Sequence, residues 1–461
     1  MNTNNLSKAP EALPKKLKIT YALGQFGWSL ILGLVNVWLV WFYNPPEGEV
    51  GALDILFIPQ VRFLGFLTII GLITMLGRLM DAVTDPWIAT MSDRSNHPKG
   101  RRISFMRKGA APFALLTILV FLPPFAPGSY LNALWLGVTL IASYVFYTMY
   151  VTPYFALVSE LGHSPKERLD LSTYISATWF LGYVTASGAS VVWGAFTTMG
   201  MEKLTAIRVT IAIFAAIGLF FMLLPVFTID EKKYSRSNPS TDKVIDSIKA
   251  TFRNREFRIF VYSDLVYWIS VTMFATGTVY YVTVLAGLPD TWTFTVTAAI
   301  GILSFLFYVP VNLIAKKIGK KSLLVFAFFA YSIVFIYTGF LGKLPLASTT
   351  QIFILIMLTG LPMAILGILP NAMIADIAEY DAISTRVNRE AMFFGARTFM
   401  SKLGQMIAML LFNGLITFGK STTNDMGIRM SAYVAGITCI GGMLILLLYN
   451  ERKILQTLKN H

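Results

Sequence analysis

The chain alternates between long apolar segments and short polar loops. Apolar stretches of 18 or more residues recur from end to end, and each is long enough to cross about 30 Å of hydrocarbon. Membrane-spanning helices are predicted at residues 19–43, 61–92, 107–125, 131–160, 171–197, 206–229, 257–287, 291–315, 322–342, 351–379, 391–419 and 429–450. The pattern therefore predicts an all-α membrane protein with twelve transmembrane helices.

The longest polar stretch separates the sixth and seventh predicted helices. Residues 231–256 are rich in Ser, Lys and Arg, and we interpret them as a cytoplasmic linker. The linker divides an N-terminal six-helix bundle (19–230) from a C-terminal one (257–450), with cytoplasmic tails at 1–18 and 451–461. Two such bundles are typical of secondary transporters, whose solute site lies between the halves at mid-membrane.

Lysine and arginine are distributed unevenly between alternate loops. If both termini are cytoplasmic, the inner loops and tails hold most of these residues, as the positive-inside rule requires. The outer side then holds only Arg62, Lys203, Arg208, Lys343, Lys420 and Arg429. An odd number of helices would remove this asymmetry. We therefore expect a multi-pass protein of the bacterial cytoplasmic (inner) membrane, embedded in the lipid bilayer.

Composition excludes several other classes of protein. Apolar residues make up 55% of the chain and charged residues 13%, and the net charge of +14 is spread over the loops. No basic domain for nucleic acid is expected. The polar N-terminus precedes a full-length span without a small-residue cleavage site, so no removable signal peptide is expected. We find no nucleophile with a base and no phosphate loop, and expect neither an enzyme, nor a cofactor, nor an obligate protein partner.

Cysteine and histidine are too few or too peripheral to form a site. The single cysteine, Cys439, excludes a disulfide and a cysteine-based metal site. The three histidines, His97, His163 and His461, lie in predicted inner loops or at the terminus. Acid–base chemistry at mid-membrane would therefore depend on carboxylates.

The second apolar segment carries three charges on one helical face. Arg78, Asp81 and Asp85 are spaced i, i+3 and i+7. Each ionisable group at the bilayer centre costs about 2.5–3.5 kcal/mol on translocon scales, so three on one helix indicate a function. Two carboxylates one turn apart repel each other and attract a cation such as sodium, lithium or a proton. Pro86 also frees a backbone carbonyl near residue 82 as a possible ligand.

Lys402 is the other charge well inside a predicted span. Thr398 lies one turn before it on the same face, and Arg397 lies nearer the inner end. A lysine near carboxylates can replace the coupling cation or respond to its arrival. The alternative is structural: Asp81 and Asp85 would only neutralise Arg78 and Lys402 in a stabilising network.

Four further acids lie closer to the predicted inner interface. We interpret them as gate or loop partners: Asp264, Asp376, Glu379 and Asp381.

Five stretches of sequence resemble a known transporter family. They are YALGQFGWSLILG, GRLMDAVTDPWIATMSDR, YTMYVTPYFAL, ERLDLSTYISA and ADIAEYDAISTRVNREAMFFGARTFMSKLG. The chain resembles the glycoside–pentoside–hexuronide:cation symporters of the major facilitator superfamily, typified by melibiose permease, over essentially its whole length. The DAxxDP core together with the late lysine carries the resemblance.

The resemblance implies a cation site and a coupling residue. It places the cation, sodium if the protein is sodium-coupled, at Asp81 and Asp85. The resemblance adds a threonine of the fourth helix, Thr148, counted back from Pro153, and it matches Thr398 and Lys402 to the family's eleventh-helix pair. Thr84 stands where the permease has asparagine, which leaves sodium or proton coupling open. We therefore expect cation binding and coupling by Asp81, Asp85, Thr84, Thr148, Thr398, Lys402 and Arg78.

The sugar-binding residues of the permease are replaced in this chain. Its lysine–aspartate pair of the first helix is Trp28 and Ser29 here, its fourth-helix aspartate aligns with Val151, and its fifth-helix arginine aligns with Ser176. Galactoside recognition is not supported. Substrate contacts are expected instead from Gln25, Trp28, Ser29, Tyr150, Phe155, Tyr174, Trp179, Trp268 and Lys402.

Two substrate classes follow from these residues. The leading expectation is a sodium- or proton-coupled symporter of a sugar or glycoside, because aromatic faces stack on sugar rings. The alternative is a cation-coupled transporter of an amphipathic, lipid-like or anionic solute, with Lys402 and Arg397 holding an acid group.

Overall fold

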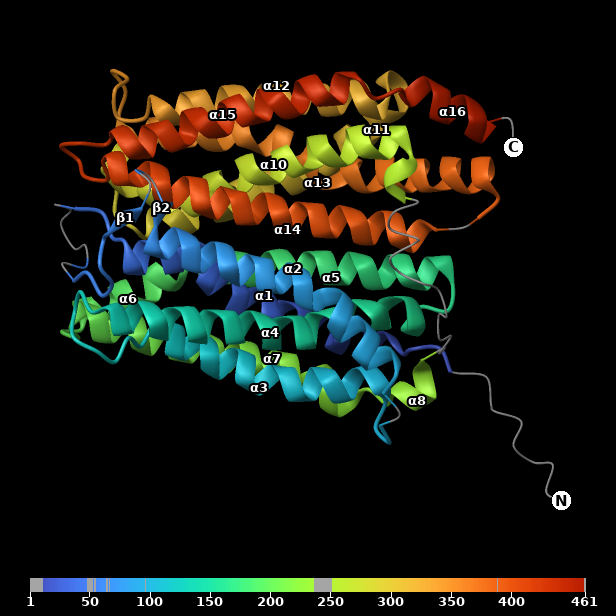
Figure 1. Cartoon of the computed structure of the whole chain (residues 1–461), viewed down its shortest axis with the longest axis horizontal. Helices are drawn as coiled ribbons and strands as arrows, with labels where there is room; N and C mark the ends of the chain where they lie inside the picture. The colour runs from blue at the N-terminus through green and yellow to red at the C-terminus, as the bar shows by residue number, and fades with distance from the viewer. Residues whose placement is uncertain are drawn as a thin grey trace. The chain divides into compact units, whose positions relative to one another are not determined.

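The computed structural model describes residues 11–47, 53, 55–63, 65, 67–95, 97–235, 251–387 and 389–459 (Figure 1). Its long helices are α1 (Lys15–Tyr43), α2 (Ile69–Asp93), α3 (Arg101–Val120), α4 (Tyr130–Leu161), α5 (Pro165–Ser187), α6 (Ala189–Thr198), α7 (Lys203–Thr228), α10 (Arg255–Tyr280), α11 (Trp292–Ile318), α12 (Lys320–Gly339), α13 (Ser348–Thr385), α14 (Glu390–Leu415) and α15 (Met426–Leu447). The shorter elements are β1 (Arg62–Phe63), β2 (Leu67–Thr68), α8 (Glu231–Tyr234), the π-helix η1 (Tyr281–Leu285), the 3₁₀-helix η2 (Ile416–Phe418) and α16 (Glu451–Lys459).

Eleven helical stretches among the described residues are long and apolar enough to cross a membrane. They correspond to eleven of the twelve predicted spans, with α5 and α6 forming one stretch (Asp170–Thr198) and α10 and η1 another (Arg255–Leu285). The second predicted span, α2, is 25 residues long but carries Arg78, Asp81 and Asp85. Because these charges lower its hydropathy, the count of twelve depends on α2 and stays a prediction.

The second helix begins later than its hydropathy predicted. We expected helix from residue 61, whereas β1 and β2 form a short antiparallel hairpin and α2 begins at Ile69. The Thr68 hydroxyl accepts a hydrogen bond from the backbone N–H of Gly71 at 3.0 Å. This hydroxyl satisfies one of the free N–H groups at the start of α2, as side-chain caps do. The cap explains why the helix begins there.

The chain divides into two compact units. Unit 1 comprises Met1–Val35, Val83–Pro124 and Leu134–Ser240, and unit 2 comprises Asn36–Ala82, Phe125–Ala133 and Thr241–His461. The later part of α1 and the first part of α2 thus belong with the C-terminal helices. The predicted bundle boundary in linker 231–256 stays a prediction, since residues 236–250 lie outside the described residues.

In unit 1, α3 and α6 pack against α7, and α1 packs against α4. Tyr21 of α1 and Tyr154 of α4 stack with ring centroids 4.4 Å apart. The Tyr154 hydroxyl donates to the carbonyl of Tyr21 at 2.9 Å, and the Tyr21 hydroxyl donates to the carbonyl of Tyr154. This reciprocal pairing satisfies both buried hydroxyls and fixes the register between the two helices.

In unit 2, α10 packs against α14 and α15, and α12 packs against α13 and α15 (Figure 1). The helices α10 and α14 approach closely at Gly404, where a Cβ would lie 2.6 Å from the carbonyl oxygen of Leu265. Small residues at such crossings let helix backbones approach each other in membranes. The end of α1 joins this unit through Asn44, which accepts hydrogen bonds from Tyr280 and Lys420.

Candidate functional site

In unit 2, the first carboxylate of α2 is paired with the lysine of α14. Lys402 Nζ donates to Asp81 Oδ1 at 2.7 Å and to the backbone carbonyl of Asp81 at 3.3 Å. The Asp81 side chain is 2% exposed and that of Lys402 is 13% exposed. A charge-assisted hydrogen bond of this length is among the stronger interactions available to a side chain. The late lysine and the first acid of the predicted cation site are therefore in direct contact.

In unit 1, the second carboxylate of α2 contacts a threonine of α4. Thr152 Oγ1 donates to Asp85 Oδ1 at 2.9 Å. Thr84, the residue before Asp85 on α2, donates through its Oγ1 to Oγ1 of Thr148, one turn before Thr152 on α4, at 3.2 Å, and both Thr84 and Thr148 are buried. The predicted Thr148 thus contacts Thr84, and Thr152 contacts the acid itself.

Thr152 was missed by the sequence analysis. It immediately precedes Pro153 and lies one turn after Thr148. The i, i+4 spacing of the two threonines places both hydroxyls on one face of α4. That spacing next to the predicted Thr148 was the signal available in the sequence.

Two other predicted site residues bond to different partners. Arg78 is buried in unit 2 and its Nη2 donates to Asn36 Oδ1 of α1, which ties α2 to α1. The Thr398 hydroxyl donates to the carbonyl of Phe394 in its own helix at 3.0 Å. Thr398 is exposed, and its hydroxyl is engaged within α14.

The carboxylates of Asp81 in unit 2 and Asp85 in unit 1, and the Thr152 hydroxyl beside Asp85, are oxygen donors. Carboxylate, hydroxyl and carbonyl oxygens suit a hard cation or a proton, whereas transition metals favour imidazole and thiolate. Among the described residues, no group of three or more His, Cys, Asp or Glu side chains could hold a metal ion. The residues present therefore fit a sodium ion or a proton.

Several predicted substrate residues meet in unit 1. The Trp28 ring lies 5.6 Å from Tyr147 and 6.0 Å from Phe155, both at steep angles. Ser29 Oγ donates to the carbonyl of Trp179 at 2.7 Å, so it links α1 to α5. Phe155 and Trp179 are both more than 40% exposed.

Tyr150 and Tyr174 differ in their surroundings. Tyr150 is fully buried and its hydroxyl donates to the carbonyl of Met222 at 2.8 Å. That hydrogen bond makes Tyr150 part of the unit 1 core. Tyr174 is partly exposed on α5.

Gln25 and Trp28 keep polar atoms without a partner among the described residues. Gln25 is 1% exposed and Trp28 is 4% exposed, yet Gln25 Oε1 and Trp28 Nε1 make no hydrogen bond within the described structure. Buried polar atoms are normally paired, so each exception requires an explanation. The two residues are three positions apart on α1 and present an acceptor and a donor. In unit 2, Nε1 of Trp268 is in the same situation.

The structure shows a further ion pair, between two residues that the sequence analysis considered separately. In unit 2, Arg397 Nε and Nη2 donate to the two carboxylate oxygens of Asp264 at 3.0 and 3.1 Å. Arg397 Nη1 also donates to Asn371 Oδ1 at 2.6 Å. The side chain of Asp264 is 3% exposed and that of Arg397 is 14% exposed. The pair lies between α10 and α14.

Two of the acids interpreted as gate or loop partners do hold basic residues near helix ends. Asp376 accepts from Lys320 at 2.6 Å, and Asp381 accepts from Arg389 at 2.8 Å. Both contacts lie in unit 2.

Comparison with known proteins identifies the family. Residues 20–453 match the family described as MFS/sugar transport protein. The chain is 21% identical over 421 residues to the inner membrane symporter YicJ of Escherichia coli (strain K12), covering 89% of this chain and 84% of that protein. It is 23% identical over 318 residues to the isoprimeverose transporter of Lactiplantibacillus pentosus, covering 67% and 61% of the two chains. It is 24% identical over 280 residues to the putative glycoside/cation symporter YagG of Escherichia coli (strain K12), covering 60% and 56%.

A solved structure shares the fold. The nucleoside transporter NupG superposes with a TM-score of 0.67 at 10% sequence identity, covering 94% of this chain and 98% of that one. At that identity the likeness concerns the fold alone, and it confirms the predicted all-α architecture of the major facilitator superfamily. The chain therefore belongs to the MFS/sugar transport protein family, and it is a membrane transporter and not an enzyme.

Proposed function

We propose that this protein is a symporter that couples a cation, bound at Asp81 and Asp85, to the transport of a sugar or glycoside. The contact between Lys402 Nζ and Asp81 Oδ1 at 2.7 Å carries the proposal. The names of similar proteins, an isoprimeverose transporter and a glycoside/cation symporter, support the substrate class. The basic residues of the predicted inner loops support a cytoplasmic membrane with both termini inside.

Lys402 acts as the competitor of the cation. Its ammonium group lies against the carboxylate that a sodium ion or a proton would neutralise. Two unit charges 4 Å apart attract by on the order of 4 kcal/mol at an effective dielectric constant of 20. A cation that neutralises Asp81 removes an attraction of this order and frees Lys402. Such a change is large enough to shift an equilibrium between two transporter conformations.

Asp85 and Thr152 supply further oxygen ligands. The carboxylate of Asp85 follows that of Asp81 by four residues in the continuous helix α2. Thr152 Oγ1 orients Asp85 by donating to Oδ1 and keeps a lone pair for a cation. The arrangement suits both sodium and a proton, so a test of coupling has to compare sodium, lithium and proton gradients.

The ion pairs of unit 2 favour a neutral solute over an anionic one. Lys402 is held by Asp81, and Arg397 is held in two hydrogen bonds by Asp264. An anion would have to displace one of these carboxylates, and breaking a buried ion pair costs about 3–5 kcal/mol. The unpaired Gln25 Oε1 and Trp28 Nε1 in unit 1 suit the hydroxyl groups of a neutral solute.

Uptake into proteoliposomes tests this function. Wild-type protein is supplied with a panel of glycosides, uronates and lysolipids under sodium, lithium or proton gradients. We expect accumulation of a glycoside under at least one gradient. The Asp85→Asn variant should lose accumulation but retain exchange of the solute across the membrane.

The matched control is Asp170→Asn. The Asp170 side chain is 46% exposed and lies 4.0 Å from Lys18 in unit 1. This variant should accumulate solute as the wild type does. Glycoside uptake that is indifferent to all three gradients, or unchanged by Asp85→Asn, would contradict the proposed coupling.

A further inference from the structure

We infer that Asp264, Arg397 and Asn371 of unit 2 form a subsite that binds the hydroxyl groups of a neutral, polyhydroxylated solute. The inference rests on the proposed function and adds the chemistry by which solute is recognised. The three residues come from α10, α14 and α13. The sequence analysis gave Asp264 and Asn371 no substrate role and considered Arg397 only for the acid group of an anionic solute.

Hydrogen bonds hold the Arg397 guanidinium in place on two of its edges. Arg397 forms a two-pronged contact with Asp264, at 3.0 and 3.1 Å, and its third nitrogen donates to Asn371 at 2.6 Å. The Phe260 ring lies 5.9 Å from the Arg397 guanidinium carbon. A guanidinium fixed on both edges and beside an aromatic ring loses little further side-chain entropy when a ligand binds.

The cluster retains unused hydrogen-bonding capacity. Arg397 uses one N–H on each of its three nitrogens, so one N–H remains on Nη1 and one on Nη2. The Asp264 oxygens keep further lone pairs, and the Asn371 amide keeps its NH₂ group. A hydroxyl group both donates and accepts one hydrogen bond. Neighbouring hydroxyls on a ring can therefore pair with a carboxylate and a guanidinium at the same time.

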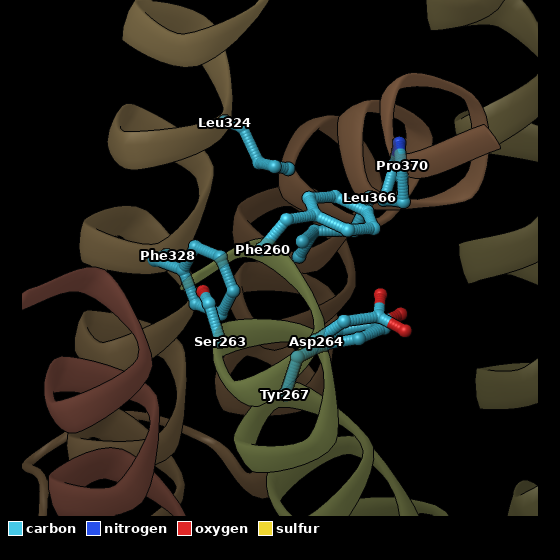
Figure 2. Close-up of a pocket in the computed structure, with 8 residues that line it drawn as sticks. All are labelled: Phe260, Ser263, Asp264, Tyr267, Leu324, Phe328, Leu366 and Pro370. Atoms are coloured by element: carbon cyan, nitrogen blue, oxygen red, sulfur yellow. The ribbon is translucent and has the colours of Figure 1, made fainter. Parts of the chain in front are cut away.

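The solvent-accessible side of the cluster is formed by polar groups. Asn371 is exposed and Arg397 is partly exposed, whereas Asp264 is buried. Figure 2 shows that the Asp264 carboxylate points away from the side on which Leu324 and Phe328 lie. The shallow hollow on that side is lined mainly by apolar side chains, with Ser263 and Asp264 as its polar lining residues. Arg397 and Asn371 are the more accessible members of the cluster, and the subsite is placed at their polar groups.

Stability alone does not require this ion pair. Replacing a buried ion pair by well-packed apolar residues is often neutral or stabilising, and ionisable residues in membrane spans mark function by default. Arg397 lies five residues from Lys402 on α14, which is about 7.5 Å along a helix axis. The two ion pairs thus lie at successive levels of α14.

The net charge of the cluster selects the solute class. Asp264 cancels the charge of Arg397, so an anion gains little and a neutral hydroxyl-rich molecule gains hydrogen bonds to charged groups.

The test compares single and exchanged variants of the pair. Asp264→Asn and Arg397→Gln are measured beside the doubly exchanged variant Asp264→Arg with Arg397→Asp. Asp425→Asn, which removes another ion pair of unit 2, serves as the matched control. The probes are isoprimeverose and nitrophenyl glycosides, with binding measured by calorimetry on purified protein and uptake measured in proteoliposomes.

Each single variant of the cluster should weaken probe binding about 10- to 100-fold, since a hydrogen bond to a charged group contributes about 1.5–3 kcal/mol. Apparent cation affinity should change less than about twofold. The exchanged variant should recover thermal stability in detergent but not probe affinity. The Asp425→Asn variant should bind the probes as the wild type does.

The outcomes separate this inference from the proposed function. If the exchanged variant recovers probe affinity, or if the single variants bind normally, the pair is structural and the inference is wrong. If the wild type binds a probe but no cation gradient drives its uptake, the proposed coupling is wrong. The binding data for the variants then still test the subsite. If the wild type binds none of the probes, the inference is overturned together with the substrate class.

Discussion

Lys402 and Asp81 are 321 residues apart in sequence, and their side chains meet at 2.7 Å in unit 2. The contact joins the middle of α14 to the part of α2 that packs with the C-terminal helices. While no other cation is bound, the Lys402 ammonium group neutralises the Asp81 carboxylate. The same contact therefore stabilises one conformation and sets the free energy that a coupling cation has to supply.

Removing Lys402 should make the site bind its cation more tightly. In Lys402→Gln the ammonium group no longer competes for Asp81, and we expect apparent cation affinity to rise about tenfold, equivalent to about 1.4 kcal/mol. Accumulation should fall, because solute transport no longer depends on releasing the lysine. Cation titrations monitored by tryptophan fluorescence measure the first effect. An unchanged titration midpoint would show that Lys402 does not compete with the cation.

Thr152 should matter more than Thr398 for cation binding. Thr152→Val removes the hydroxyl that donates to the Asp85 carboxylate, and a hydrogen bond to a charged group contributes about 1.5–3 kcal/mol, so cation affinity should weaken about 10- to 100-fold. Thr398→Val removes a hydroxyl bonded within its own helix and should change affinity little. Thr185→Val, whose hydroxyl bonds to Leu181 of its own helix, is the control for unit 1. The reverse order of effects would favour the site implied by the family resemblance alone.

Glu231 should make stability depend on pH in the weakly acidic range. Its carboxylate accepts hydrogen bonds from the backbone N–H groups of Arg102 at 2.9 Å and Ile103 at 2.8 Å, at the start of α3. Burial raises the pKa of Glu231 above its usual 4.5, despite these hydrogen bonds. The folded protein therefore binds the proton more tightly than the unfolded chain, and this contribution to stability is lost as pH rises from 4.5 through the raised pKa.

Thermal unfolding in detergent between pH 4 and 7 measures this effect. The Glu231→Gln variant cannot titrate, so its melting temperature should lack the component that falls with rising pH. A variant that keeps the full pH dependence of the wild type would place the titrating group elsewhere.

Gly100 should tolerate substitution poorly, because two constraints meet there. Its φ of +106° is unfavourable for L side chains, and a Cβ would lie 2.3 Å from Glu231 Oε2. Gly100→Ala should therefore lower the melting temperature and disturb the Glu231 contact. Gly128 has a φ of +76° with nothing within 4 Å of an added Cβ, so Gly128→Ala isolates the backbone term. Equal losses in the two variants would show that the Glu231 contact contributes nothing.

The apolar segments and the charges of α2 were readable from the sequence because their causes are local. Lipid requires about 20 apolar residues per helix, and this length is visible in the sequence of each span. The penalty for charge in a membrane singles out Arg78, Asp81 and Asp85 without any knowledge of their neighbours. The hairpin at 62–68 was missed because its apolar residues look the same in a hairpin as in a helix. Only the Thr68 side-chain cap, seen in the structure, marks the true start of α2.

The sequence by itself determined which helices form and which of them carry charge, since hydrophobic length and helical spacing act within a segment. Only the tertiary structure decided the partners: Asp81 with Lys402, Asp85 with Thr152, and Asp264 with Arg397, the last two residues being 133 positions apart. Those pairings depend on how far each helix is shifted along its axis relative to the helix it packs against. Close approaches such as that of α14 to α10 at Gly404 set this register, and no periodicity within a single segment encodes it.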